Sequence, residues 1–163
     1  MGLFTNLFGN WSARPAVTPL PPGASAREVI GLAVRNAREE NGGNCATLEV
    51  VSDRGRWAQI MKDSINCSYP HREDPGLLFP DLFGREFIAN LEDFNPNGYM
   101  MIRLHEVDAA EATSWLAEYF TQVLGVDLDT AQLKLQMEFL LARSPWRWVG
   151  LAISRVVSTA LLC

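Results

Sequence analysis

The sequence predicts an α+β fold in which helices pack on one face of an antiparallel sheet. The first observation is a capped amphipathic pattern over residues 25–41, which is typical of a helix. The second is a set of short alternating segments, three joined by tight turns over residues 45–69 and a strong one over residues 99–107. The third is a series of helix patterns from residue 108 onward. We therefore expect a sheet built from a meander plus a hairpin, followed by a helical C-terminal extension.

The first predicted helix begins with a capping box. Ser25 is followed three residues later by Glu28, and in this motif each residue's side chain binds the free backbone N–H of the other. Gly42 and Gly43 follow the pattern and are expected to end the helix. Five apolar residues at helical spacing are expected to lie on the sheet: Val29, Ile30, Ala33, Val34 and Ala37.

Residues 45–69 predict three antiparallel strands in a meander. In the first strand, Ala46, Leu48 and Val50 alternate with Cys45, Thr47 and Glu49, which indicates one dry face and one wetter face. A turn at residues 52–55 separates the first strand from the second, and Lys62 with Asp63 separates the second from the third. The second strand carries Trp57, Gln59 and Met61 on one side and Ala58 and Ile60 on the other, and the third carries Ile65, Cys67 and Tyr69.

The next segment, residues 75–87, mixes large apolar side chains with two prolines and two glycines, which are too many breakers for a long helix. Such a segment either folds as a lid over an open end of the core or presents an apolar surface to a partner. Residues 88–94 predict a weak strand. The Asn-Pro-Asn-Gly sequence at 95–98 predicts a hairpin turn into the strong strand at 99–107, because Asn and Gly tolerate positive φ.

Three helices are predicted after the last strand. Asp108 and Glu111 form a second capping box, and Gly125 is expected to end the helix that they open. Asp129 or Thr130 is then expected to cap a shorter helix. Ser144 with Pro145 is a good start for the final helix, whose wide apolar face suits core packing or a dimer interface. The apolar stripes comprise Ala112, Trp115, Leu116, Tyr119, Phe120 and Val123 in the first, Leu133, Met137, Leu140 and Leu141 in the second, and Trp146, Val149, Ile153, Val156, Val157, Ala160 and Leu161 in the third.

The domain organisation follows from these patterns. Residues 1–23 contain four prolines and are expected to form a Pro-rich leader or arm, because proline fixes its own φ and disfavours helix in its predecessor. Residues 24–163 are expected to form a single α+β domain that ends with the C-terminal helices at 129–163. The 163 residues suit one domain.

Composition and charge exclude several classes of function. Hydrophobic residues make up 48% and charged residues 20%, which is ordinary for a globular protein. The net charge of −5 and the scattered basic residues argue against nucleic acid as a partner, whereas an acidic surface would attract a basic protein. Arg155, near the centre of the final helix, argues against stable membrane insertion. Three cysteines without paired spacing and only two histidines predict no disulfide framework, no metal, no cofactor and a cytoplasmic location.

One pair of residues could carry chemistry. Cys67 and His71 lie four residues apart and are followed by Glu73 and Asp74, so a thiolate beside an imidazole and a carboxylate is conceivable. A nucleophile also needs preorganised oxyanion donors, which nothing in the sequence predicts. We therefore assign no catalytic residue, and a small Cys/His-dependent enzyme remains an alternative.

Large apolar and aromatic side chains exceed what one helix-covered sheet face requires. We expect the surplus to form a surface that binds another polypeptide, because Trp and Tyr supply large rigid contact areas. The candidate partner-binding residues are Trp57, Tyr69, Phe79, Phe83, Trp146, Val149 and Ile153.

The order of patterns from Ser25 to Val123 resembles the type III secretion chaperone-like fold and its YbjN-type relatives. The residues that carry the resemblance are the capped helix from Ser25, the strands at 46–51, 57–61 and 65–69, and the strand at 99–106 that leads into Asp108. The resemblance implies a non-enzymatic, usually dimeric protein that holds another polypeptide along its sheet or helix faces.

The leading expectation is therefore a chaperone-like, bacterial-type protein-binding module whose partner is an effector or another client, with a homodimer as a further possibility. The first alternative is an immunity or inhibitor protein that neutralises a basic toxin, since a small acidic α+β domain suits that role as well. Neighbouring genes would separate the two, because a toxin gene favours immunity and a secretion operon favours a chaperone.

Overall fold

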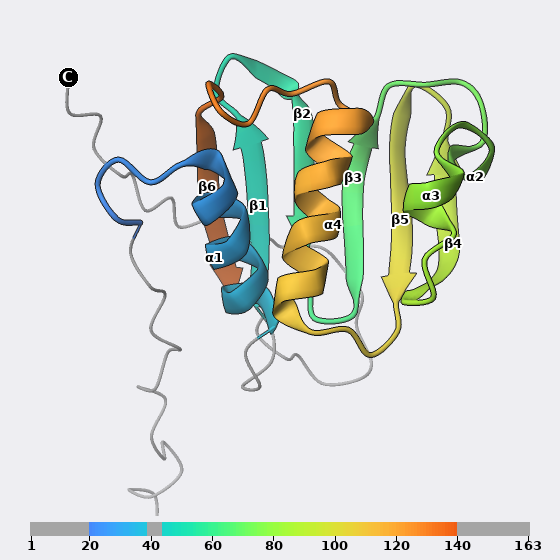
Figure 1. Ribbon diagram of the computed structural model, residues 1–163, viewed down its shortest axis with the longest axis horizontal. Helices are drawn as coiled ribbons and strands as arrows, with labels where there is room; N and C mark the ends of the chain where they lie inside the picture. The colour runs from blue at the N-terminus through green and yellow to red at the C-terminus, as the bar shows by residue number, and fades with distance from the viewer. Residues whose placement is uncertain (1–19, 39–43, 140–163) are drawn as a thin grey trace, which may run out of the picture.

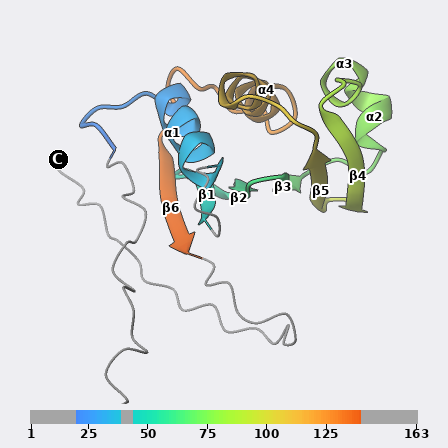
Figure 2. The same cartoon turned by 90° about the horizontal axis from the view of Figure 1, so that it is seen from below.

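In a computed structural model, which describes residues 20–38 and 44–139, a six-stranded antiparallel sheet carries all the helices of these residues on one face (Figures 1 and 2). The strand order is β4-β5-β3-β2-β1-β6. This arrangement confirms the predicted α+β class, with helices on one side of an antiparallel sheet. In chain order the elements are α1 (Ala26–Arg38), β1 (Asn44–Val50), β2 (Asp53–Ile60), β3 (Ser64–Tyr69), α2 (Pro75–Leu78), α3 (Pro80–Phe83), β4 (Ile88–Asn95), β5 (Gly98–Leu104), α4 (Ala109–Gln122) and β6 (Leu133–Phe139).

The predicted meander forms, and the face predicted to be dry in its first strand is buried. Strands β1, β2 and β3 pair antiparallel in sequence order, and Leu48 lies opposite Ala58, which lies opposite Cys67. These three side chains are fully buried. The core therefore lies between this face of the sheet and the apolar sides of α1 and α4.

The predicted caps of α1 and α4 are present. Ser25 donates its backbone N–H and its hydroxyl to Glu28 Oε2, both at 2.8 Å. Asp108 Oδ1 accepts the backbone N–H of Glu111 at 2.7 Å, and Gly125 follows α4 with a φ of 62°. The stripe predicted for α4 is buried along its whole length. The predicted end of the first helix at Gly42 and Gly43 lies outside the described residues.

Residues 75–104 form two one-turn helices and a hairpin, and a long helix is absent from this segment, as its breakers predict. Prolines begin both α2 and α3, and Gly84 caps the C-terminal end of α3. Asn97 has a φ of 54° in the turn between β4 and β5, which fits the tolerance of Asn for this conformation. Strand β5 ends at Leu104, three residues before the predicted boundary.

The shorter helix predicted after Asp129 or Thr130 is wrong, because Leu133–Phe139 forms strand β6. All seven residues of β6 pair antiparallel with β1. Asp129 and Thr130 belong instead to a turn in which Asp127 accepts the Asp129 backbone N–H at 3.1 Å and the Thr130 hydroxyl at 2.9 Å. Without β6, β1 would be an edge strand of the sheet. Pairing with β1 therefore decides the conformation of residues 133–139, and it outweighs their local helical pattern. Leu140, Leu141, the final predicted helix and residues 1–19 of the predicted leader lie outside the described residues.

Candidate functional site

An aromatic cluster holds the chain after β3 against the core. The Tyr69 ring lies 5.3 Å from the His71 ring and 5.2 Å from the Phe94 ring, and the His71 ring lies 5.3 Å from that of Phe79. His71 Nε2–H donates to the Val123 carbonyl oxygen at 3.0 Å. These contacts fix the position from which α2 departs.

A second aromatic group fixes α3 against α4. The Phe83 ring meets the rings of Trp115 and Tyr119 edge to face, at centroid distances of 6.0 and 6.3 Å. Trp115 and Tyr119 stack on each other at 5.4 Å. Trp115 Nε1–H donates to the Leu82 carbonyl oxygen at 2.9 Å, so the indole satisfies its buried donor and binds the α3 backbone at once.

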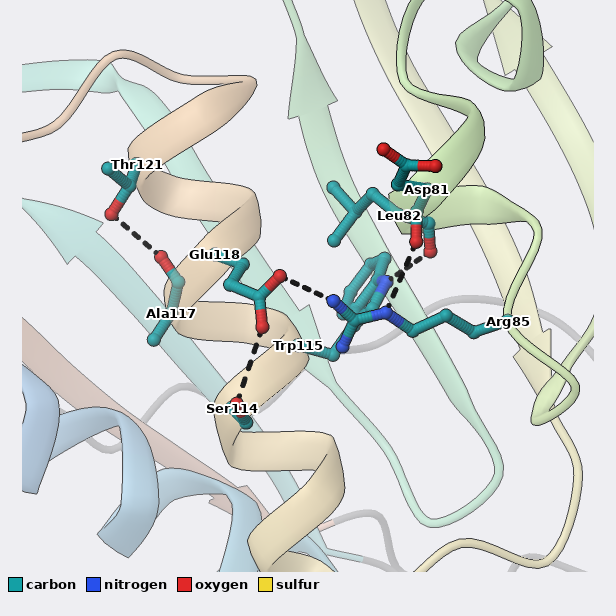
Figure 3. A network of polar contacts seen from close by, with 8 residues as sticks. All are labelled: Asp81, Leu82, Arg85, Ser114, Trp115, Ala117, Glu118 and Thr121. Carbon is teal, nitrogen blue, oxygen red and sulfur yellow. Dashed lines mark hydrogen bonds and ion pairs between the residues drawn. The ribbon is translucent and has the colours of Figure 1, made fainter.

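A polar network lies at the solvent-exposed periphery of the contact between α3 and α4 (Figure 3). Arg85 forms an ion pair with Glu118 of α4, and its Nε–H donates to the Asp81 carbonyl oxygen at 3.3 Å. Ser114 donates its hydroxyl to the other oxygen of Glu118 at 3.4 Å. The side chains of Arg85 and Glu118 are each about one-third exposed, so the ion pair contributes little to stability. The pair nevertheless orients the end of α3.

The outer side of the same segment is apolar and exposed. Leu77 has 82% of its surface exposed and Leu78 has 40%, whereas Pro75 and Leu82 are buried. Leu91 of β4 is also exposed. Because α2 lies over the β4 end of the sheet in both views, all three leucines belong to one end of the molecule (Figures 1 and 2). We call α2 together with β4 the α2–β4 edge.

Strand β4 is an edge strand with an acidic surrounding. It pairs with β5 on one side, and no strand of the described residues pairs with its other side. Its ladder shifts register twice, between Ile88 and Asn90 and between Leu91 and Asp93. Residues 73–95 contain six acidic residues and one basic residue, Arg85, which is already paired with Glu118. Acidic residues therefore predominate within residues 73–95.

The structure distributes the predicted partner-binding residues over several environments. Tyr69 is fully buried and its hydroxyl donates to the Glu73 carbonyl oxygen at 2.9 Å, so it belongs to the core and not to a contact surface. Phe79 and Phe83 are half-buried and pack against the core. Trp57 is half-buried on the opposite face of the sheet, away from the α2–β4 edge. The remaining three, Trp146, Val149 and Ile153, lie outside the described residues.

The structure does not bring Cys67 and His71 together as a catalytic pair. The Cys67 thiol is fully buried on the helix-covered face and donates to the Met100 carbonyl oxygen at 3.9 Å. Burial raises the pKa of this thiol to about 12, and a hydrogen bond with Tyr119 offsets the effect only in part. The ring nitrogen of His71 is committed to Val123, as described above. A neutral, buried thiol of this kind is a poor nucleophile.

Two open clefts lie at the other end of α4, near its N-terminus. One is lined by residues that include Arg38, Lys62 and Asp63, the other by Arg85, Glu86 and Glu111, and both include His105 and Glu106. Acidic and basic side chains are mixed around both clefts, and they do not converge on one point. Across the described part of the chain, no group of three or more His, Cys, Asp and Glu side chains is arranged to hold a metal ion.

The exposed leucines were not among the predicted site residues. Leu77 and Leu78 stand in a run of apolar residues between two prolines, and a four-residue helix gives no periodicity that separates inner from outer positions. Leu91 is flanked by polar residues, which was the one available signal that it lies in an exposed strand.

No protein-family model, curated protein or solved structure matches this chain. Within residues 20–38 and 44–139, none of the helices has the length and apolarity needed to cross a bilayer.

Proposed function

We propose that this protein is a non-enzymatic, chaperone-like binding module that holds a segment of another polypeptide at the α2–β4 edge. The observation that carries the proposal is the exposure of Leu77, Leu78 and Leu91 on two elements at one end of the molecule. Large exposed apolar side chains at one end of a molecule are typical of protein-interaction sites.

The geometry of the edge supports an extended apolar segment as the bound partner. The outer side of β4 offers backbone donors and acceptors to an added strand, and leucine side chains beside it supply apolar contacts. The inner anchors at Phe79, Phe83 and Trp115 hold α2 in place, so a partner meets a preorganised surface. The order of the elements up to α4 is the order on which the chaperone-like resemblance is based, and β6 follows it as a sixth strand.

The charge around the edge favours a basic segment. Residues 73–95, which include α2 and β4, contain six acidic residues, of which Glu92 is paired with Arg103 at 2.6 Å. The same charge supports the second candidate, an immunity or inhibitor protein for a basic toxin. The two candidates share the surface and differ in whether the bound protein loses an activity.

Site-specific photo-crosslinking in the native host tests the proposal. A photo-reactive amino acid replaces Leu77 in one variant and Val51 in a control variant, because Val51 is 55% exposed but lies in the β1–β2 turn, far along the strand order from β4. We expect a polypeptide adduct at position 77 that is absent at position 51.

Four results would each point to a different conclusion. An adduct with a second copy of the chain would replace the client with a homodimer, and equal adducts at both positions would mean that the edge has no specificity. If no polypeptide is captured at position 77, the proposed function fails. If the captured partner is an enzyme or toxin that the bound protein inhibits, the immunity role replaces the chaperone-like one.

A further inference from the structure

Strand β6 forms the second edge of the sheet, and its ladder is regular. All seven residues of β6 pair with β1 without a shift in register, whereas the ladder between β4 and β5 shifts twice. On the side away from β1, β6 has no neighbouring strand within residues 20–38 and 44–139. A flexible polypeptide can follow an irregular edge, whereas a second folded sheet needs a regular one. Of the two edges of the described sheet, β6 is therefore the one that suits pairing with another sheet.

A hydrogen bond before β6 fixes which of its backbone groups point outward. Val51 donates its backbone N–H to the Gln132 carbonyl oxygen at 2.9 Å, so the backbone groups of Gln132 face β1. Because these groups alternate along an antiparallel strand, every second residue after Gln132 also faces β1. The backbone groups of the residues between them face away from β1, and these residues include Leu133, Leu135 and Met137. The outer side of β6 can therefore exchange hydrogen bonds with an added strand.

The sequence of β6 is complementary to itself when two copies run antiparallel. The register in which the two strands overlap completely places Gln136 opposite Gln136 of the second copy. It also places Leu135 opposite Met137 and Lys134 opposite Glu138. Any shifted register loses both the complete overlap and this charge pair. Opposite charges on directly opposing residues stabilise an antiparallel pair, so the charges of β6 favour the complete register.

This register gives Glu138 a cation that the described residues do not supply. Glu138 forms no ion pair within that part of the chain, and its neighbour on β1 is Cys45. Lys134 Nζ lies 3.9 Å from Glu49 Oε2, but Arg54 Nε also lies 3.6 Å from the other oxygen of Glu49, and the Lys134 side chain is 48% exposed. In the paired strands, Lys134 would lie between Glu49 of its own chain and Glu138 of the second copy. This pair is of the non-hydrogen-bonded type, in which opposing side chains approach most closely.

The apolar side of β6 matches in the same register. Leu135 and Met137 are half-buried, and both pack against the core on the helix-covered side of the sheet. Because opposing residues lie on one face of an antiparallel pair, Leu135 of each copy would cover Met137 of the other. The helices of both copies then lie on the same face of one continuous sheet. Helix α1, which lies beside β6, would face α1 of the second copy across the symmetry axis (Figure 2).

We infer that two copies of this chain form a two-fold symmetric dimer in which their β6 strands pair antiparallel about Gln136. The contact is isologous, since the same strand of each copy supplies both halves of it. The inference is independent of the proposed function, because the α2–β4 edge lies at the opposite end of the strand order. The dimer would carry one α2–β4 edge at each end of its continuous sheet.

Charge exchange in the full chain tests this pairing, with dimerisation measured by sedimentation velocity. Lys134→Glu places negative charges opposite each other, and Glu138→Lys places positive charges opposite each other. We expect each variant to dimerise more weakly than the wild-type chain, by on the order of tenfold. An equimolar mixture of the two variants should dimerise about as strongly as the wild-type chain, because the mixed dimer restores opposite charges at both positions. Lys62→Glu makes the same change in the exposed turn between β2 and β3, and this matched control should dimerise as the wild-type chain does.

The inference is overturned if the wild-type chain is monomeric at the highest concentration at which it stays soluble. It is also overturned if both variants dimerise as strongly as the wild-type chain, or if mixing them restores nothing. Should either variant fail to fold, a photo-reactive amino acid at Gln136, mixed with an excess of the wild-type chain, gives the second test. An adduct that joins the β6 strands of two copies supports the pairing, whereas an adduct confined to one chain, or none, contradicts it.

Discussion

The inner side of the segment from Pro75 to Phe83 is bonded to the core, whereas the outer side presents apolar surface to water. On the inner side, Phe83 packs against Trp115 and Tyr119, and the Trp115 indole binds the Leu82 carbonyl oxygen. On the outer side, Leu77 and Leu78 are 82% and 40% exposed. Stability explains the inner residues and gives no reason for the outer ones, which fits the proposed binding role of the outer leucines.

Trp115→Ala should give the largest loss of stability among the residues that fix this segment. Trp115 is fully buried, and its removal leaves a cavity and an unbonded Leu82 carbonyl oxygen. We expect the free energy of unfolding to fall by about 3–5 kcal/mol, measured by urea denaturation. A loss below about 1 kcal/mol would show that the indole does not anchor α3.

Phe83→Ala should have a smaller effect on stability and a visible effect on binding. The ring is half-buried, so we expect the free energy of unfolding to fall by about 2 kcal/mol. Because α2 and α3 would lose their fixed position, partner capture at position 77 should also weaken. Unchanged capture in a folded Phe83→Ala variant would mean that preorganisation of the segment does not matter.

Arg85→Gln tests the exposed rim of the same contact. The ion pair with Glu118 is about one-third exposed, so screening by solvent limits its contribution, and we expect a loss below about 1 kcal/mol. A double-mutant cycle with Glu118→Gln isolates the pair from the other contacts of each residue. A coupling energy of several kcal/mol would show that this ion pair is one of the main contacts that hold α3 against α4.

Leu77→Ser should change stability least and binding most. The side chain contacts mainly water, so the free energy of unfolding should stay within about 0.5 kcal/mol of the wild-type value. Partner affinity, measured by calorimetry with the captured partner, should fall by on the order of tenfold or more. Val51→Ser is the matched control and should alter neither quantity. A stability loss without a binding loss would reverse the interpretation of the outer side.

Much of the fold follows from local signals in the sequence. The caps at Ser25 and Asp108, the alternation from Ala46 to Tyr69 and the turn at Asn97 are each determined by residues close in the chain, and each is present. The segment from Leu133 to Phe139 was different. Leu133 and Met137 fit a helical spacing, while Leu133, Leu135 and Met137 fit strand alternation equally well. Pairing with β1 decides between them, and that contact is nonlocal.

The candidate site was less predictable than the fold. The sequence indicated that residues 75–87 either cover the core or bind a partner, and in the structure Phe79 and Phe83 pack inward while Leu77 and Leu78 are exposed. Adjacent apolar residues in a one-turn helix carry no signal that separates these roles. Tyr69 shows the opposite error: its aromatic side chain suggested a contact surface, whereas the structure buries it in the core.

Hydrogen exchange of the chain with and without its captured partner tests the central claim most directly. The account predicts that binding slows exchange of the backbone amides of α2 and β4 and leaves β6, the other edge strand of the described sheet, unchanged. Protection at β6 alone, or no new protection at α2 and β4 when the partner is bound, would contradict it.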